Sequence, residues 1–302
     1  IDGRPVDLRV STMPGKYGEK VVIRIIDNRN ALLPIEKMGM SPDMVERWRS
    51  VITHPHGMIL VTGPTGSGKS TTLYSALNEI STDELNISTV ENPVEANVPG
   101  INQFQTNAKA GFTFAGALRS LLRQDPDVLM VGEIRDLETA TIATQAALTG
   151  HLVFSTLHTN DAPSAVTRLV NMGVEPYLVA AMLRAVLAQR LVRKICPHCK
   201  EILEPEPWVR DAVEKELGSC GELFHGPGCS RCGGTGYAGR LGLFELLIPD
   251  ETLLAAVSND APLQQLRAVA EQAGHRPLFA DGVRKASVGL TTIEEVLRVC
   301  AV

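Results

Sequence analysis

The residues best suited to chemistry form a glycine-rich run that ends in a lysine and a serine. The run fits the phosphate-loop pattern G-x-x-x-x-G-K-[ST] at every fixed position, and consists of Gly63, Pro64, Thr65, Gly66, Ser67, Gly68, Lys69 and Ser70. Its glycines allow backbone N–H groups to surround phosphate oxygens. Lys69 would reach the β- and γ-phosphates, the Ser70 hydroxyl would bind Mg²⁺, and Thr71 would join the phosphate-binding turn. The pattern predicts an ATP site; the alternative is a glycine-rich turn that binds nothing.

Hydrolysis of ATP also needs carboxylates near the metal and the attacking water. The apolar run from Val128 to Val131 is followed by Glu133, which we expect at the tip of a Walker B strand. An earlier apolar segment, 86–90, is followed by Glu91 and Glu95. The ends of parallel strands meet at one edge of a sheet, so these carboxylates would lie beside the phosphate loop. The alternative is that they are solvated loop residues.

Two histidines flank the next apolar segment, 152–156. His151 and His158 are seven residues apart and point to opposite faces of an ideal strand, so they are not expected to share a metal. His158 would lie just past the strand end, where a group that senses the γ-phosphate is placed. The alternative for both histidines is a structural role in the core or at a cap, and this alternative carries more weight for His151 than for His158.

Four of the six cysteines occur as two C-x-x-C pairs. These are Cys196 with Cys199 and Cys229 with Cys232. Two such pairs supply four thiolates in a tetrahedron, which leaves no open position for water, so the pattern predicts a structural Zn²⁺ site. Disulfide bonds are the alternative.

Alternating strand and helix patterns surround these residues. Strands are expected at 6–10, 21–26, 57–62, 86–90, 128–131 and 152–156, and helices at 43–53, 69–80, 112–123, 137–148, from 161 to about 173, and 208–217. The run 178–195 is interpreted as a packed helix, and further helices are expected in 250–302. This alternation predicts an α/β fold with a mainly parallel sheet.

Composition is that of an ordinary globular protein. The chain has 302 residues, 44% of them hydrophobic and 21% charged, and a net charge of −5, which argues against a large nucleic-acid surface. No uncharged apolar run reaches the length of a membrane span and no signal peptide is visible, so direct membrane insertion is not expected. The chain begins at Ile1 in a strand-like segment, and we expect it to be a fragment.

Taken together, these motifs resemble the secretion-ATPase superfamily, and within it the ATPases of type II secretion and type IV pilus assembly (the GspE/PilB group). The resemblance covers nearly the whole chain. It depends on the phosphate loop, the segments 89–95, 119–127, 132–136 and 150–158, and the four cysteines. The cysteine pairs favour secretion or pilus extension over pilus retraction.

The resemblance implies a homo-hexameric ATPase with a RecA-like core that drives assembly of pseudopilin or pilin filaments. It implies a cytoplasmic protein, held at the inner membrane by secretion or pilus platform proteins. Arg9 and Arg24 would be donated to the nucleotide from an N-terminal lobe. The resemblance assigns Glu95 as the general base and Glu133 as the magnesium-shell residue. The opposite assignment of these two roles is the alternative. Asn92 departs from the family, where the acidic segment usually reads Glu-Asp-Pro.

The expected organisation has five parts. Residues 1–30 would be a remnant of the N-terminal lobe, 31–42 a linker, 43–195 the RecA-like core, 196–240 the zinc module and 241–302 a helical region. Type II secretion is the leading assignment and pilus extension is the alternative within the family. Alternatives from other classes are a nucleic-acid translocase, a small-molecule kinase and a nucleotide-sensing scaffold.

Overall fold

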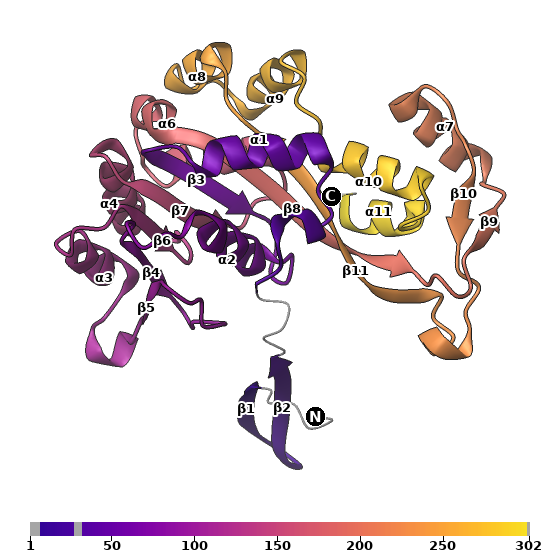
Figure 1. Ribbon diagram of the computed structural model, residues 1–302, viewed down its shortest axis with the longest axis horizontal. Coiled ribbons are helices and arrows are strands. Elements are labelled where there is room, and N and C mark those ends of the chain that lie inside the picture. The colour runs from indigo at the N-terminus through magenta and orange to yellow at the C-terminus, as the bar shows by residue number, and fades with distance from the viewer. Residues whose placement is uncertain (1–6, 27–31, 301–302) are drawn as a thin grey trace.

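The fold is built on a seven-stranded sheet with the strand order β11-β8-β3-β7-β6-β4-β5 (Figure 1). A computed structural model describes residues 7–26 and 32–300. All neighbouring strands run parallel except β11, which is antiparallel to β8. The strands are β3 (Gly57–Thr62), β4 (Ile87–Glu91), β5 (Asn102–Gln105), β6 (Val128–Val131), β7 (Leu152–Leu157), β8 (Leu183–Ile195) and β11 (Tyr237–Leu247). The predicted mainly parallel α/β sheet is confirmed.

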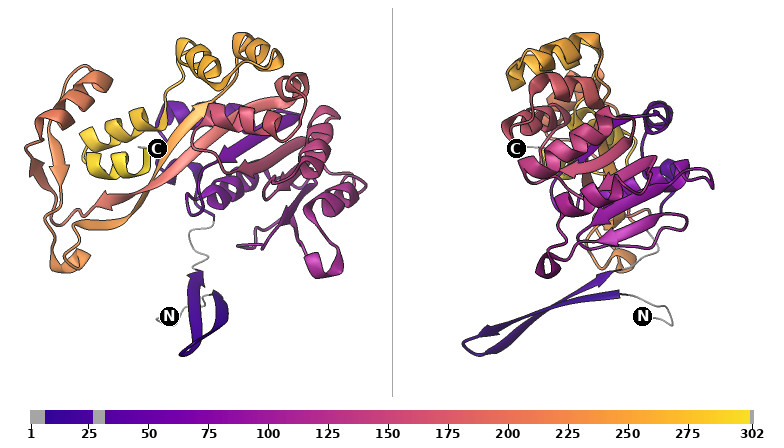
Figure 2. Two further views of the ribbon diagram at one scale, coloured as in Figure 1. Left: turned by 180° about the vertical axis from the view of Figure 1, so that it is seen from behind. Right: turned by 90° about the vertical axis from the view of Figure 1, so that its left-hand side faces the viewer.

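Helices cover both faces of this sheet, as a parallel sheet requires. One apolar core lies between the sheet and α1 (Pro42–Ile52) and α2 (Lys69–Ile80). The second core lies on the other face, under α3 (Phe114–Leu121), α4 (Leu137–Leu148), α5 (Ala162–Asn171), α6 (Pro176–Met182), α8 (Glu251–Ser258) and α9 (Leu263–Gln272). Strands β3, β4, β6 and β7 are buried along their whole length. Figure 2 shows the two helical layers from behind and from the side.

The prediction of a helix over 178–195 was wrong. Helix α6 ends at Met182, and Leu183 begins a long strand, β8, that pairs with β3 on one side and β11 on the other. Helices cover both faces of the sheet, so most of β8 is buried, and a short buried apolar run cannot be told from a buried helix by periodicity alone. Strand β11, which was not predicted, is the partner that buries the second edge of β8.

The long strands β8 and β11 extend beyond the core into an arm, at the right of Figure 1. The arm contains β9 (Glu201–Leu203), α7 (Pro207–Leu217), β10 (Leu223–His225) and the short helix η4 (Ser230–Cys232). Helices α10 (Leu278–Ser287) and α11 (Ile293–Cys300) fill the angle between the arm and the core. Val209, Val213 and Leu223 of the arm pack with Val283 and Ile293 of these helices.

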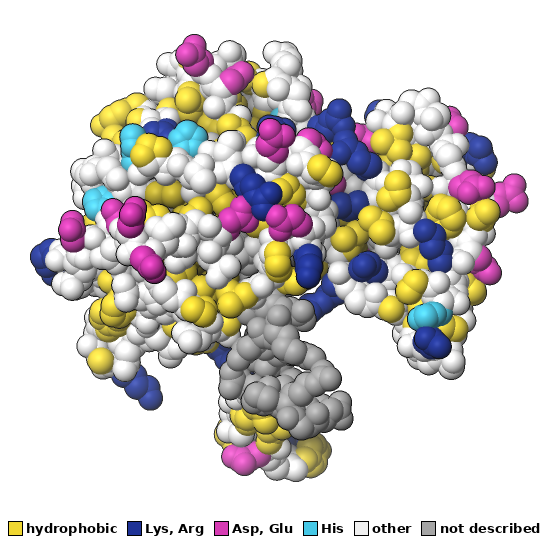
Figure 3. Space-filling view, viewed as in Figure 1, with side chains coloured by type: hydrophobic (Ala, Val, Ile, Leu, Met, Phe, Trp, Pro, Cys, Tyr) yellow, Lys and Arg dark blue, Asp and Glu magenta, His cyan; other side chains and the backbone are white. Residues whose placement is uncertain are grey.

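The N-terminal strands β1 (Asp7–Gly15) and β2 (Gly18–Ile26) form an antiparallel hairpin. Both predicted strands are therefore present, and each is longer than expected. Leu8, Val10 and Ile23 are more than half exposed, and Figure 3 shows apolar side chains on the visible face of this hairpin. Over the residues that the structure describes, no helix is both long enough and apolar enough to cross a bilayer.

Candidate nucleotide site and cysteine cluster

The phosphate loop connects the carboxyl end of β3 to the first turn of α2. Gly63 has φ 147° and Gly68 has φ 91°, a region of backbone space that suits glycine. A Cβ on Gly63 would lie 2.5 Å from the Gln189 carbonyl oxygen. Strand, loop and helix therefore have the arrangement that the motif needs, with the free N–H groups of α2 at the loop.

Lys69 lies over this loop. Its Nζ donates to the carbonyl oxygens of Gly63 at 2.9 Å and Pro64 at 3.1 Å. Burial lowers the pKa of Lys69, whereas the nearby negative charges of Glu133 and Glu95 act in the opposite direction. The two carboxylates predicted from separate strand ends thus both act on the lysine of the phosphate loop.

Glu133 is the more enclosed of these carboxylates. It follows β6, its side chain is 13% exposed, and Arg135 Nε donates to it at 2.6 Å. His158 follows β7, and its Nε2 lies 3.6 Å from Glu133 Oε2. Burial and then the charge of Lys69 lower the pKa of His158, which favours the neutral ring. The structure therefore brings Lys69, Glu133 and His158 together at one edge of the sheet.

Glu91 is buried at the end of β4 and its carboxylate is engaged by neighbouring side chains. It accepts hydrogen bonds from the Tyr74 hydroxyl, from Thr89 Oγ1 at 2.7 Å and from Gln103 Nε2 at 3.1 Å. Glu95 lies in the loop that follows, is exposed, and its backbone N–H donates to the Tyr74 hydroxyl at 3.1 Å. The predicted role of Glu91 in nucleotide binding stays a prediction.

His151 and the two arginines lie elsewhere. His151 precedes β7, at the opposite edge of the sheet, and its Nδ1 lies 3.0 Å from the Ala146 carbonyl oxygen. It lines a cavity of about 630 Å³ formed with α1 and the end of α2. Arg9 is exposed on the hairpin opposite Arg24 in the strand register, and the side chain of Arg24 lies outside the described residues. His151 therefore lies away from the phosphate loop, and the predicted roles of Arg9 and Arg24 stay predictions.

Sequence reasoning missed the residue of β8 that holds the phosphate loop. Gln189 is buried; its Nε2 donates to the Ser67 carbonyl oxygen at 2.6 Å, and its Oε1 accepts from Thr72 Oγ1 at 2.7 Å. Thr159 was also missed, and its hydroxyl lies 2.7 Å from that of Thr62 at the end of β3. Only a correct assignment of β8 as the neighbour of β3 would have pointed to Gln189.

The four cysteines form the predicted cluster, just after the end of β8 and just before the start of β11. Their sulfur atoms lie within 4.8 Å of one another, and the separations for Cys196–Cys229, Cys199–Cys232 and Cys229–Cys232 are 3.9, 3.9 and 3.7 Å. Four sulfurs at about 2.3 Å from a tetrahedral Zn²⁺ are about 3.8 Å apart, so the cluster fits this metal. The separations are far longer than the S–S bond of about 2.05 Å in a disulfide.

Backbone N–H groups support a thiolate at this cluster. The N–H groups of Cys229 and Gly236 donate to the Cys232 sulfur at 3.2 and 3.3 Å. The hydrogen bond from Cys229 is the largest effect that lowers the pKa of Cys232, to about 6. Such bonds to the ligand atoms are usual around structural metal sites.

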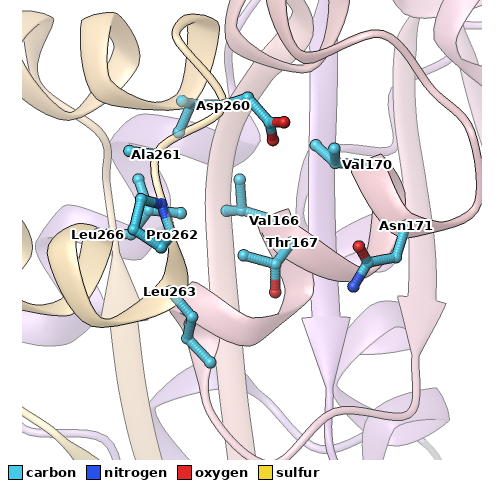
Figure 4. Close-up of a pocket in the computed structure, with 10 residues that line it drawn as sticks. Val166, Thr167, Val170, Asn171, Asp260, Ala261, Pro262, Leu263 and Leu266 are labelled. Carbon is cyan, nitrogen blue, oxygen red and sulfur yellow. The ribbon is translucent and has the colours of Figure 1, made fainter.

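A separate cavity of about 290 Å³ lies between α5 and the segment formed by α8, α9 and the turn that joins them (Figure 4). Val166 and Val170 of α5 face Pro262 and Leu266 across it. Its lining combines apolar side chains with the polar Thr167, Asn171 and Asp260, and includes none of the predicted site residues. The phosphate loop is the region of the described structure where the motifs converge.

Comparisons with known proteins agree with this geometry. The family model for type II/IV secretion system proteins matches residues 1–298. The chain is 51% identical over 295 residues to the type IV pilus assembly ATPase PilB of Thermus thermophilus, covering 97% of the chain and 33% of PilB. It is 50% identical over 299 residues to the type II secretion system ATPase E of Vibrio cholerae, covering 99% of the chain and 59% of that protein.

Among solved structures, the chain is similar to the pilus retraction motor PilT with bound ADP. The TM-score is 0.71 at 28% sequence identity, over 97% of this chain and 73% of PilT. The chain therefore spans only part of the length of each of these proteins.

Proposed function

Because the chain belongs to the type II/IV secretion system protein family, we propose that it is the ATP-hydrolysing part of a hexameric motor. The motor would power assembly of pseudopilin filaments in type II secretion, or, as the alternative, extension of type IV pili. One observation carries the proposal: the phosphate loop leaves the end of β3, and Glu133 and His158 meet, 3.6 Å apart, just after the ends of the neighbouring strands β6 and β7. The near-equal identity to the two kinds of relative does not separate these alternatives.

The residues at this edge of the sheet suit hydrolysis of a triphosphate by positioning and charge. Backbone N–H groups of the loop and the Lys69 ammonium would bind the phosphates. The electrostatic attraction between these groups and the phosphates is stronger where water is excluded. Ser70 and Glu133 would hold a Mg²⁺ ion, which when bound neutralises charge on the phosphates. The neutral ring of His158 lies beside Glu133 and would contact the terminal phosphate.

The environments of the two carboxylates support their assigned roles. Glu133 is enclosed, and Arg135 holds its carboxylate, which suits a fixed group in the magnesium shell. Glu95 is exposed on a loop, so its carboxylate is accessible to a water molecule from which it would take a proton. Arg9 and Arg24 would add positive charge in the transition state when the hairpin meets a nucleotide in the assembled ring.

The remaining organisation is part of the same proposal. The arm from Cys196 onward would be a structural zinc module, the hairpin a remnant of an N-terminal lobe, and the helices after β11 a C-terminal module. Residues 237–247 also add a strand to the central sheet, so the core and the C-terminal module share an element. The hexamer would work in the cytoplasm, held at the inner membrane by platform proteins of the secretion or pilus machinery.

The test is ATP turnover measured across a range of protein concentrations, together with the oligomeric state. We expect turnover per chain to rise as oligomers form, to be lost in Lys69→Ala and to fall strongly in Arg9→Ala. Arg47→Ala, which removes an exposed arginine from α1, is the matched control and should have no effect. Turnover that is independent of concentration and of Arg9 would exclude a ring motor, and salt-dependent stimulation by DNA would favour a translocase.

A further inference from the structure

Tyr74 is a buried residue of α2 whose hydroxyl links the phosphate-loop helix to the loop that carries Glu95. Its side chain is 1% exposed. The hydroxyl donates a hydrogen bond to Glu91 and accepts one, at 3.1 Å, from the backbone N–H of Glu95. One oxygen atom therefore holds both the end of β4 and the backbone of the proposed base.

We propose that Tyr74 is a positioning residue that fixes Glu95 relative to the phosphate loop. Tyr74 lies four residues after Ser70, so the two side chains share one face of α2. The helix that presents Ser70 to the metal thus also sets where the proposed base lies. The inference rests on the proposed role of Glu95, and the experiments below separate the two.

A phenol suits this task because it donates and accepts at once. The bond to the carboxylate of Glu91 requires the proton to stay on the Tyr74 oxygen. Burial first, and then the hydrogen bond to Glu91, raise the pKa of Tyr74 and keep the hydroxyl protonated. A phenylalanine would fill the same space without either hydrogen bond, and would leave the Glu95 N–H without this partner.

Two glutamines of β5 also hold the same loop. Gln103 Oε1 accepts from the Val98 N–H at 2.7 Å and its Nε2 donates to the Ala96 carbonyl oxygen at 3.0 Å. Gln105 Oε1 accepts from the Val94 N–H at 3.1 Å. Within the described residues, the Glu95 carboxylate itself makes no hydrogen bond. The Glu95 N–H and its neighbours Val94, Ala96 and Val98 are thus held by hydrogen bonds, while the Glu95 carboxylate stays available for water.

Positioning of this kind has a large effect on rate, because a displacement of about 1 Å at a reacting group costs on the order of 100-fold. Loss of the Tyr74 hydroxyl releases one of the contacts on the loop, and the glutamines of β5 remain. We therefore expect a fall in kcat of about 10-fold to 100-fold in Tyr74→Phe. The affinity for ATP should stay within about twofold, because the Tyr74 hydroxyl is bonded to Glu91 and to the Glu95 N–H and not to the phosphate loop.

The first test is hydrogen exchange at the backbone amide of Glu95, which needs no turnover. In Tyr74→Phe this amide should exchange at least about 10-fold faster, while the melting temperature and the exchange of α2 stay close to those of the unmodified chain. Tyr177→Phe removes a hydroxyl from a tyrosine that is 58% exposed and is the matched control. Unchanged exchange at Glu95 would overturn the inference.

The second test is a double-mutant cycle on ATP turnover with Glu95→Gln. If Tyr74 acts through Glu95, Tyr74→Phe should lower turnover in the unmodified chain and have no further effect in the Glu95→Gln background. An equal loss in both backgrounds would contradict the inference. If Glu95→Gln alone keeps full turnover, the proposed base is wrong, whereas the exchange measurement still reports on the loop.

A third variant tests the inference independently if Tyr74→Phe fails to fold. Gln105 is exposed and contacts the same loop through Val94, so Gln105→Met weakens the loop without opening the core. We expect a smaller loss of kcat, again absent in the Glu95→Gln background. If Gln105→Met and Tyr74→Phe both kept full activity and unchanged hydrogen exchange of the loop amides, the loop would not depend on its contacts with Tyr74 and Gln105.

Discussion

The contact between Gln189 and the phosphate loop gives the sharpest prediction outside the nucleotide-binding residues. Gln189→Leu keeps the size of a buried side chain and removes both of its hydrogen bonds to the loop and α2. The Ser67 carbonyl oxygen loses its donor, at 2.6 Å in the structure. The Thr72 hydroxyl keeps a second acceptor, the Gly68 carbonyl oxygen at 3.3 Å. The damage is therefore concentrated at Ser67, in the middle of the loop.

The magnitude follows from these contacts. A net hydrogen bond contributes about 1 kcal/mol, and a buried carbonyl left without a donor costs about 1–3 kcal/mol. We expect a loss of about 2–4 kcal/mol in total. It is divided between the free energy of unfolding and the free energy of the loop conformation that binds phosphates. About 1.4 kcal/mol of this would lower ATP affinity tenfold, and 2.7 kcal/mol would lower it 100-fold.

Calorimetric titration with MgATP, together with urea unfolding, measures both parts. Gln189→Glu keeps the acceptor for Thr72 but places a carboxylate against the Ser67 carbonyl oxygen, so its affinity should fall at least as far. Gln145→Leu, at an exposed position on α4, is the control for the change in side-chain type. If Gln189→Leu bound MgATP as tightly as the unmodified chain, the loop would not depend on β8.

Two further predictions concern the arm and the C-terminal helices. Elemental mass spectrometry of the purified chain should find one Zn²⁺ per chain. Cys229→Ser should lose the metal and have a melting temperature several degrees lower, whereas the control Cys220→Ser should keep both the metal and the melting temperature. A chain whose melting temperature does not change when the metal is removed would refute a structural zinc. Burial would raise the pKa of Glu295, but hydrogen bonds from Arg298 and Arg193 outweigh it and lower the pKa to about 2. This group therefore contributes up to about 3 kcal/mol to the free energy of unfolding above pH 4.5, and the contribution is lost as the pH falls toward 2. Glu295→Gln should be less stable than the unmodified chain at pH 7 and differ little from it near pH 2; an equal difference at both pH values would contradict this cause.

Features encoded by short local patterns could be predicted from the sequence. The phosphate loop, the strand that ends before Glu133 and the cysteine pairs each depend on a few residues close together in the chain. The α/β fold followed from regular alternation, and the structure confirms it. Both hairpin strands and helix α7 were likewise visible locally, in turn residues and helical spacing.

Features set by distant neighbours could not be predicted. Most of the run from Leu183 to Ile195 is buried because it forms a strand inside the sheet, between β3 and β11, and the sequence does not show which strands these are. The contact of Gln189 with the loop depends on the same pairing. Tyr74 lies within the predicted helix 69–80, but its link to Glu95 joins positions 21 residues apart and has no local signal in the sequence.

Calorimetric titration of the folded chain with MgATP, repeated on Lys69→Ala, tests the central claim most directly. We expect saturable binding of one nucleotide per chain, and an affinity at least about 100-fold weaker in the variant, because the charge beside the loop is lost. Heat of binding that is absent in the unmodified chain, or the same in both proteins, would contradict the claim that this loop binds the triphosphate.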